Sequence, residues 1–260
     1  MILTIISDTH NKHHQLKLPG GDILIHAGDC TRNGTLSEVE NFLQWLSVQP
    51  YERKVFIAGN HDMLFQQRPV RSRRLLKKFP GITYLQDSGV TIGGLHIYGS
   101  PWTPRFGCWS FTLDRWGDNL AHKWFNIPKD VHVLLTHGPP YGILDTAYNN
   151  HCGCEILANV LKDLKPLIHV FGHIHESPGM VGFYSDTLSI NASMVEHHSE
   201  RITRKPINIL ITEIIEETCQ ENSDVVASKK FTYSIIEEEN KNDDDDLRDS
   251  GAVPQGGETS

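Results

Sequence analysis

Five short apolar segments of this 260-residue chain each lead directly into side chains that can bind metal ions. The strand-like segments are Leu3 to Ile6, Ile23 to Ala27, Val55 to Ala58, His132 to Thr136, and Leu167 to Phe171. In the same order they are followed by Asp8 and His10, Asp29, Asn60 and His61, His137, and finally His173 and His175. In open α/β sheets, ligands collect beyond the carboxyl ends of the strands. The sequence therefore predicts that these side chains meet at one site.

The strand-like segments alternate with segments of helical pattern, which is typical of an α/β fold. The clearest helix is predicted over Thr35 to Val48, where Thr35 and Glu38 form a capping-box pattern before an apolar face. A hairpin is predicted around Gly93-Gly94, because this two-residue spacer separates two strand-like runs. A hairpin makes its strands antiparallel, so we expect mixed rather than purely parallel sheets.

The composition favours one large domain followed by a short tail. Hydrophobic residues make up 38% of the chain, which is enough to fill a sizeable core. We expect this domain over residues 1–217, closed by strands at 188–190 and 207–215. Residues 218–236 are interpreted as a C-terminal extension. Residues 237–260 are acidic and rich in Gly, Ser and Pro, so we expect a disordered, solvated tail, with recruitment of a partner as the alternative.

Charge and hydropathy exclude several classes of protein. No apolar stretch approaches the roughly 20 residues that a membrane span requires, and the first residues lack the basic region of a signal peptide. Five scattered cysteines, an odd number, suit a reducing compartment, so we expect a cytoplasmic protein. The close pair Cys152 and Cys154 is interpreted as structural rather than as a zinc or redox site. A formal charge of -8 argues against a binding surface for long nucleic acid.

The residue types at the predicted site determine which ions it suits. Carboxylate, imidazole and amide groups form a mixed set of oxygen and nitrogen ligands, which suits Mn, Fe, Zn or similar ions better than a thiolate site would. Asp29 has two carboxylate oxygens and can bridge two ions. We expect Gly28, Gly59 and Gly172 to permit tight turns where the strands end at the site.

The polar residues form five blocks in a fixed order. The blocks are Asp8-x-His10, Gly28-Asp29, Gly59-Asn60-His61-Asp62, His137, and Gly172-His173-x-His175. Together they resemble the motif set of the calcineurin-like metallophosphoesterases, over about the first 200 residues. The sequence around them is similar to metallophosphoesterase-domain proteins grouped near the class III cyclic-nucleotide phosphodiesterases. This resemblance implies an α/β, layered metallophosphoesterase fold, with mixed β-sheets packed as a sandwich and flanked by helices.

The resemblance also implies two divalent metal ions as cofactors, with Mn first and Fe, Zn, Ni or Co as alternatives. The first ion is expected on Asp8, His10, Asp29 and His175. The second is expected on Asp29, Asn60, His137 and His173, so that Asp29 bridges the pair. His61 is the expected catalytic residue, which protonates the leaving oxygen or stabilises the transition state, and Asp62 is expected to orient it. The implied nucleophile is a hydroxide shared by the two ions.

The implied activity is that of a metal-dependent phosphoric ester hydrolase acting on small phosphodiesters, nucleotides among them. A phosphomonoesterase acting on nucleotides or phosphoproteins is the first alternative, and an inactive binding protein is the second. The aromatic segment Pro101 to Trp109 either stacks on a substrate ring or forms a small hydrophobic cluster. Tyr141 and the loop Asn149 to His151 are further predicted pocket residues. The sequence does not determine an oligomeric state.

Overall fold

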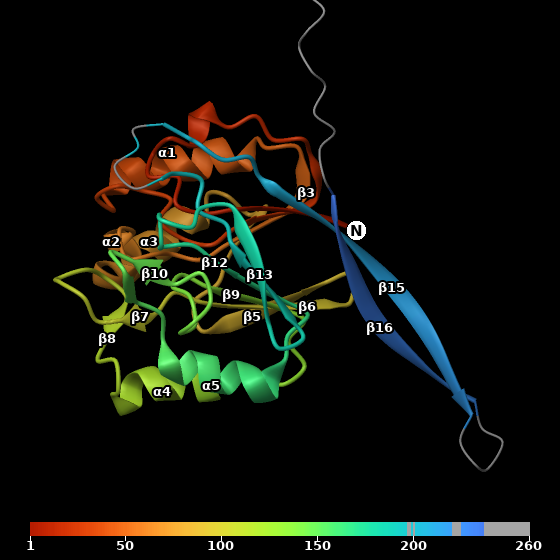
Figure 1. Ribbon diagram of the computed structural model, residues 1–260. Helices are drawn as coiled ribbons and strands as arrows, with labels where there is room; N and C mark the ends of the chain where they lie inside the picture. Colours follow the sequence, from red (N-terminus) through yellow and green to blue (C-terminus); the bar gives the residue numbers. More distant parts are fainter. Residues whose placement is uncertain (197–198, 200, 220–224, 237–260) are drawn as a thin grey trace, which may run out of the picture.

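Two six-stranded β-sheets lie face to face in the computed structural model, which describes residues 1–196, 199, 201–219 and 225–236 (Figure 1). The first sheet has the order β16-β15-β1-β2-β3-β4. Its strands are β1 (Ile2–Ile6), β2 (Gly21–His26), β3 (Tyr51–Phe56), β4 (Ile82–Tyr84), β15 (Ile207–Cys219) and β16 (Val225–Ile236). The strands from β1 to β4 are parallel, whereas β15 runs antiparallel to both β1 and β16.

The second sheet has the order β13-β14-β12-β9-β6-β5 and is also mixed. Its strands are β5 (Ser88–Ile92), β6 (Leu95–Ser100), β9 (Val133–Thr136), β12 (Ile168–Phe171), β13 (Met180–Tyr184) and β14 (Thr187–Asn191). The four central strands are parallel and the two outer pairings are antiparallel. Two short ribbons complete the β-structure: β7 (Thr103–Pro104) with β8 (Thr112–Leu113), and β10 (Thr146–Ala147) with β11 (Asn150–His151). The predicted mixed sheets are therefore confirmed.

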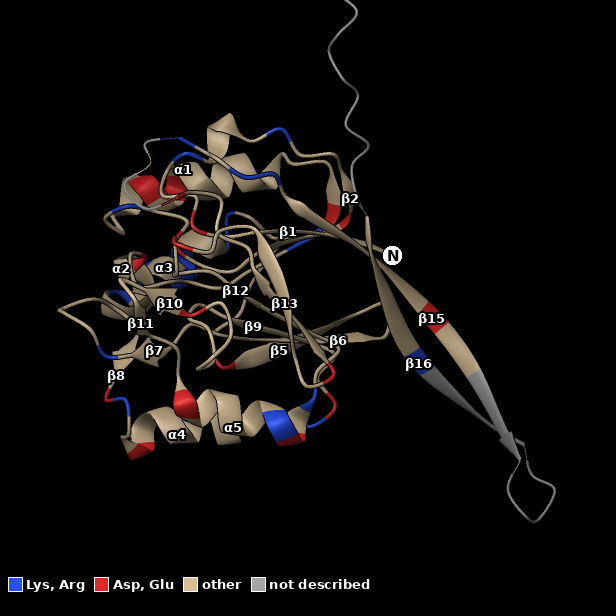
Figure 2. Cartoon of the chain, in the orientation of Figure 1, with Lys and Arg blue, Asp and Glu red and all other residues tan. Residues whose placement is uncertain are grey.

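Helices cover the outer face of each sheet, so the molecule has four layers (Figure 1). The helices are α1 (Leu36–Ser47), α2 (Met63–Gln67) and α3 (Pro69–Leu76) on the first sheet, and α4 (Asp118–Phe125) and α5 (Glu155–Leu164) on the second. A 3-10 helix, η1 (His13–Gln15), lies beside α1. Lys, Arg, Asp and Glu colour mainly the helices and loops, while the strands between the layers carry few of them (Figure 2). The predicted sandwich flanked by helices is confirmed.

Alternating side chains of the strands build the core. Ile5 and Ile25 point from the first sheet, and Val133 and Val170 from the second, into one cluster between the sheets. Neighbouring residues on the same strands point outward to the helices, as Ile6 of β1 does, because side chains alternate across a strand. Among the described residues no helix combines the length and apolarity needed to cross a membrane. The cytoplasmic location stays a prediction.

The local signals for the first long helix and the first hairpin are confirmed. Thr35 is the N-cap of α1, and its hydroxyl accepts a 3.3 Å hydrogen bond from the backbone N–H of Glu38. The Glu38 carboxylate accepts one of 2.8 Å from the backbone N–H of Thr35 in return. Such a cap stabilises a helix by about 1 kcal/mol. The hairpin β5–β6 turns at Gly93 and Gly94, both with positive φ.

The C-terminal strands extend further than the sequence pattern indicates. The pattern weakens after Glu216, yet β15 continues to Cys219 and pairs with β16 along its length. The pair projects from the body of the molecule as a long two-stranded ribbon (Figure 1). The expected domain boundary at residue 217 falls inside β15, and the division of the chain stays a prediction. The tail from 237 to 260 lies outside the described residues.

All five strands predicted from the apolar segments are present, but they belong to two sheets. β1, β2 and β3 lie in the first sheet, and β9 and β12 lie in the second. These five strands are parallel to their neighbours among the five in each sheet, so their carboxyl ends reach the same edge. The two edges meet there, because the side chain of Asn60, after β3, contacts that of His137, after β9. The site therefore lies where the two sheets join.

Candidate metal centre

The predicted ligands follow the strand ends on sharply turning backbone. Four of them, Asp8, His10, Asp29 and His173, have left-handed φ angles of 53°, 41°, 53° and 70°. This conformation is uncommon for residues other than glycine, and clusters of it mark functional sites. The turns are held by backbone hydrogen bonds between neighbouring strands, including one of 2.9 Å from the N–H of Asp8 to the carbonyl oxygen of Gly28. The strained backbone thus directs these side chains to one place.

One group of potential ligands comprises Asp8, His10 and His175. The Nε2 atom of His175 lies 3.1 Å from Oδ1 of Asp8, and Nε2 of His10 lies 3.9 Å from the same oxygen. The two Nε2 atoms are 3.5 Å apart. One carboxylate oxygen and two ring nitrogens therefore face a common point.

A second group comprises Asp29, His137 and His173, with Asn60 beside it. The Nε2 atom of His137 lies 2.9 Å from Oδ1 of Asn60 and 3.3 Å from Oδ2 of Asp29. Oδ2 of Asp29 also lies 3.8 Å from Nε2 of His10, which belongs to the first group. Asp29 is 2% exposed and stands between the two groups.

Two of the glycines in the sequence blocks make room for these ligands. A Cβ atom on Gly59 would collide with the carboxylate of Asp29, and one on Gly172 would collide with the carboxylate of Asp8. Gly28 does have the positive φ, 102°, that its predicted turn requires. Gly59 and Gly172 do not have a positive φ. Their role is close approach of backbone to ligand rather than the tight turn expected from the sequence.

The side chains of the centre differ in charge state, because burial and neighbouring charges shift their pKa values in different directions. Burial would raise the pKa of Asp29, but the neighbouring His137 outweighs it and holds that pKa well below its usual value. Burial would lower the pKa of His137, but Asp29 raises it to about 9. Burial lowers the pKa of His10 to about 4 and that of His173 to about 3. The centre therefore holds ionised carboxylate, neutral rings at His10 and His173, and a ring at His137 that is protonated at neutral pH.

This combination fits divalent metal ions. Ionised Asp8 and Asp29 are buried, and a divalent ion would supply the opposite charge that buried charge requires, in place of the proton on His137. The neutral rings of His10 and His173 present lone pairs, which is the form in which imidazole binds a metal. Carboxylate, imidazole and the amide of Asn60 supply oxygen and nitrogen ligands without a thiolate. The residues brought together include the seven that the sequence predicts as ligands, and His61 also lies within reach of His10 and Asp29.

His61 lies at the rim of the centre and is positioned by backbone. Its Nδ1 lies 2.7 Å from the carbonyl oxygen of Arg32, so this nitrogen donates. Its own backbone N–H donates to Oδ1 of Asp29 over 2.8 Å. In the neutral ring, Nε2 is left unprotonated, and the side chain lines the cavity above the ligands. Arg32 was not foreseen, because a backbone carbonyl contact has no side-chain signature in the sequence.

Asp62 does not orient His61, which corrects the role predicted from the sequence. Its buried carboxylate accepts hydrogen bonds from the backbone N–H groups of Gly59, at 2.8 Å, and Thr31, at 2.9 Å. It also accepts from the backbone N–H of Cys30 at 3.2 Å and the Thr31 hydroxyl at 2.6 Å. The turn after Gly59 directs the carboxylate back toward residues 30 and 31. Asp62 thereby ties the loop after β2 to the loop after β3.

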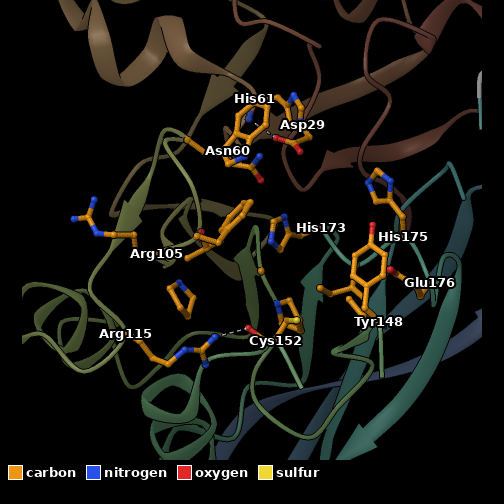
Figure 3. Close-up of a pocket in the computed structure, with 18 residues that line it drawn as sticks. Asp29, Asn60, His61, Arg105, Arg115, Tyr148, Cys152, His173, His175 and Glu176 are labelled. Carbon is orange, nitrogen blue, oxygen red and sulfur yellow. Dashed lines mark hydrogen bonds between the residues drawn. The ribbon is translucent and has the colours of Figure 1, made fainter. Parts of the chain in front are cut away.

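A cavity of about 490 Å³ opens above the metal centre. Its floor includes Asp29, Asn60, His61, His173 and His175, and its wall includes Thr103 to Phe106, Trp109, Ala147, Tyr148 and Cys152 (Figure 3). The aromatic segment is divided between the cavity and the core, and its stacking on a substrate ring stays a prediction. Phe106 and Trp109 line the cavity, whereas Trp102 packs against the core and donates through Nε1 to Asp87.

The other predicted pocket residues, Tyr141 and Asn149 to His151, do not line the cavity. Tyr148 and Cys152, which flank Asn149 to His151 in the chain, do line it. Asn149 and Asn150 are typical turn residues, and this signal could have indicated that Tyr148, directly before them, lies in the turn. The Sγ of Cys154 accepts a 3.5 Å hydrogen bond at the start of α5, which fits the structural role predicted for it.

The calcineurin-like phosphoesterase family model matches residues 1–177 of the chain. Metallophosphoesterase domain-containing protein 1 of Homo sapiens is 42% identical over 214 residues, and the match covers 73% of this chain and 64% of the human protein. The chain thus spans less than two thirds of that relative's length. A UPF0046 protein of Caenorhabditis elegans is 36% identical over 210 residues, which cover 76% of this chain and 71% of the worm protein.

Solved structures agree on the fold. The crystal structure of the protein TT1561 from Thermus thermophilus superposes with a TM-score of 0.57 and covers 75% of this chain and 89% of the Thermus chain. The two sequences are 15% identical, so the likeness concerns the fold alone.

Proposed function

Because the chain belongs to the calcineurin-like phosphoesterase family, which is metal-dependent, we propose that it hydrolyses phosphodiester bonds of small organic substrates, nucleotides among them, with two divalent ions. Mn²⁺ is the proposed ion, with Fe, Zn, Ni or Co as alternatives. The observation that carries the proposal is the position of Asp29. One of its oxygens, Oδ2, faces His10 of one ligand group and His137 of the other.

The proposed ligand assignment follows these groups. Asp8, His10, Asp29 and His175 would hold the first ion, and Asp29, Asn60, His137 and His173 the second. Divalent ions bound there supply Lewis acidity toward phosphoryl oxygens and lower the pKa of water. The residues contribute negative charge at Asp8 and Asp29 and keep the rings of His10 and His173 neutral.

His61 is the proposed acid for the departing oxygen. Its Nδ1 is held on the carbonyl oxygen of Arg32, so Nε2 is the atom that can carry a proton to the substrate. The ring contacts Trp109, with centroids 4.2 Å apart, and this contact limits its movement. Protonated His61 would give that proton to the leaving oxygen as its bond to phosphorus breaks.

The size of the cavity supports a diester. A phosphoryl group on the floor leaves most of the roughly 490 Å³ for the two ester substituents. Phe106 and Trp109 offer apolar surface to such substituents. A monoester has only one ester substituent and would fill less of the cavity. This is the reason to place diesters before monoesters.

Turnover of bis-p-nitrophenyl phosphate and p-nitrophenyl phosphate with added Mn²⁺ tests the proposal. We expect a higher kcat/KM for the diester, and loss of turnover on chelation. A clear preference for the monoester would instead establish the phosphomonoesterase alternative. The absence of turnover for both esters, across Mn, Fe, Zn, Ni and Co, would favour the inactive binding protein.

A further inference from the structure

The short ribbon β10–β11 presents Tyr148 to the cavity. Ala147 pairs with Asn150, so Tyr148 and Asn149 form the two-residue turn. Both turn residues have positive φ, 49° and 62°. Turns of this kind favour Asn and Gly, and a bulky residue with positive φ is a genuine outlier. An exposed tyrosine is therefore kept where the backbone disfavours it, which points to a role for its ring.

Asp145 fixes the base of this ribbon. Its carboxylate, 1% exposed, accepts hydrogen bonds from the backbone N–H of Gly142 at 3.0 Å and of Gly153 at 3.1 Å. It also accepts from Nδ1 of His151 at 2.7 Å. Its backbone carbonyl accepts from the N–H of Cys152 at 2.9 Å. One side chain thus joins both ends of the ribbon.

Arg115 holds the ribbon from the side of the cavity. Its guanidinium donates to the carbonyl oxygen of Gly153 at 2.6 Å. It also donates to that of Cys152 at 3.1 Å (Figure 3). The same group pairs with Glu155, at the start of α5, at 2.8 Å. Together with Asp145, Arg115 makes the turn a firmly supported part of the wall.

Two further rings face the same cavity directly above its floor. The ring of Phe106 lies 4.9 Å from that of His173, and Trp109 lies 4.2 Å from His61. They come from the segment around Arg105, which lies across the cavity from Tyr148 in Figure 3. Aromatic surface is thus present on both sides of the space above the metal centre.

We propose that Tyr148 is a specificity-determining residue, which forms with Phe106 and Trp109 a slot for a flat aromatic ring carried by the phosphoester. The inference rests on the proposed phosphodiesterase function and narrows its substrates to esters with an aromatic substituent. The rings supply stacking surface, which tolerates different ring structures because every aromatic has a π-face. The slot acts on the substituent that stays on phosphorus, without a change in the reaction.

Two diesters with one leaving group isolate the slot. Phenyl p-nitrophenyl phosphate and methyl p-nitrophenyl phosphate both release p-nitrophenolate, so they differ only in the retained group. With Mn²⁺ we expect a kcat/KM for the phenyl ester about tenfold that for the methyl ester, mainly through KM. The variant Tyr148→Asn should reduce this ratio to about twofold and leave the methyl ester nearly unchanged.

The choice of variants separates the ring from the fold. Asn tolerates positive φ, so Tyr148→Asn removes the ring without adding strain. Tyr148→Phe retains the ring and should keep the preference. Tyr141→Asn is the matched control, because Tyr141 is exposed and does not line the cavity. An unchanged ratio in Tyr148→Asn, or its loss in Tyr148→Phe, would overturn the proposal.

A binding measurement tests the slot without relying on turnover. Phenylphosphonate and methylphosphonate are not hydrolysed, and calorimetry with the Mn²⁺-loaded protein gives their Kd values. We expect about tenfold tighter binding of phenylphosphonate, reduced in Tyr148→Asn only. Preferential binding without any turnover would reject the proposed function and retain the slot. Turnover without an aromatic preference in either assay would retain the function and reject the slot.

Discussion

The proposed metal ligands on the cavity floor follow the ends of strands from both sheets, whereas the wall above them comes from loops and the short ribbon β10–β11. Asp29 on the floor is 2% exposed and Tyr148 on the wall is 71% exposed. The floor is positioned by sheet topology and strained backbone, and the wall by side chains such as Asp145 and Arg115. Changes to the floor should therefore affect the reaction itself, and changes to the wall the choice of substrate.

The largest effect is expected for Asp29→Asn, which removes the charge shared by the two ligand groups. We expect metal content to fall at both positions and kcat/KM to drop roughly a thousandfold, because both ions contribute to stabilising the transition state. Elemental analysis and diester turnover measure the two quantities. Asp163→Asn, an exposed change on α5, is the control. Two ions per chain retained in Asp29→Asn would contradict the bridging role.

The next effect concerns His61, which belongs to the floor but is held by the loop carbonyl of Arg32. On a diester whose leaving group is an alcohol, we expect His61→Ala to lower kcat roughly 10²- to 10⁴-fold, the usual contribution of a general acid. Metal content should stay unchanged, since the two ligand groups are intact without His61. His122→Ala, an exposed change on α4, should behave as wild type. A parallel loss of metal would instead identify His61 as a ligand.

A substitution at Asp62 tests whether the floor depends on the hydrogen bonds that join the loop after β2 to the loop after β3. Asp62→Ala leaves the buried N–H groups of Gly59, Cys30 and Thr31 without their acceptor. We expect a loss of about 3 kcal/mol in the free energy of unfolding, because each unpaired buried donor costs about 1–3 kcal/mol. Chemical denaturation measures it. An unchanged stability, with a kcat as low as that of His61→Ala, would restore the role of orienting His61.

The same contrast explains what the sequence could predict. Strand-like runs and the residues after them can be read locally, so the α/β class was predicted correctly, and the residues predicted as ligands do lie close together. Their role as ligands stays a prediction. Their division between two sheets could not be predicted, because strand pairing across distant segments leaves no local pattern. Asp62 was misread for a related reason: its partners at residues 30 and 31 are distant in sequence.

The wall was predicted least well, since loop conformation depends on contacts that only the fold creates. Tyr148 reaches the cavity because of a turn with positive φ at both residues, anchored by Asp145 and Arg115. Of the aromatic segment, Trp102 turns to the core and Trp109 to the cavity, although both rings are alike in hydrophobicity. Sequence could identify a set of candidate rings but not the direction of each.

The smallest effect is expected for Arg115→Met, which changes the support of the wall and leaves the floor intact. The variant removes hydrogen bonds to the carbonyl oxygens of Gly153 and Cys152, so the ribbon that carries Tyr148 should become less ordered. We expect KM for phenyl p-nitrophenyl phosphate to rise about fivefold, the equivalent of about 1 kcal/mol, with kcat and metal content unchanged. Lys165→Met is the matched control, because Lys165 forms an exposed pair with Asp186 away from the cavity. A fall in metal content would show that wall and floor are coupled, and the separation between them would then be wrong.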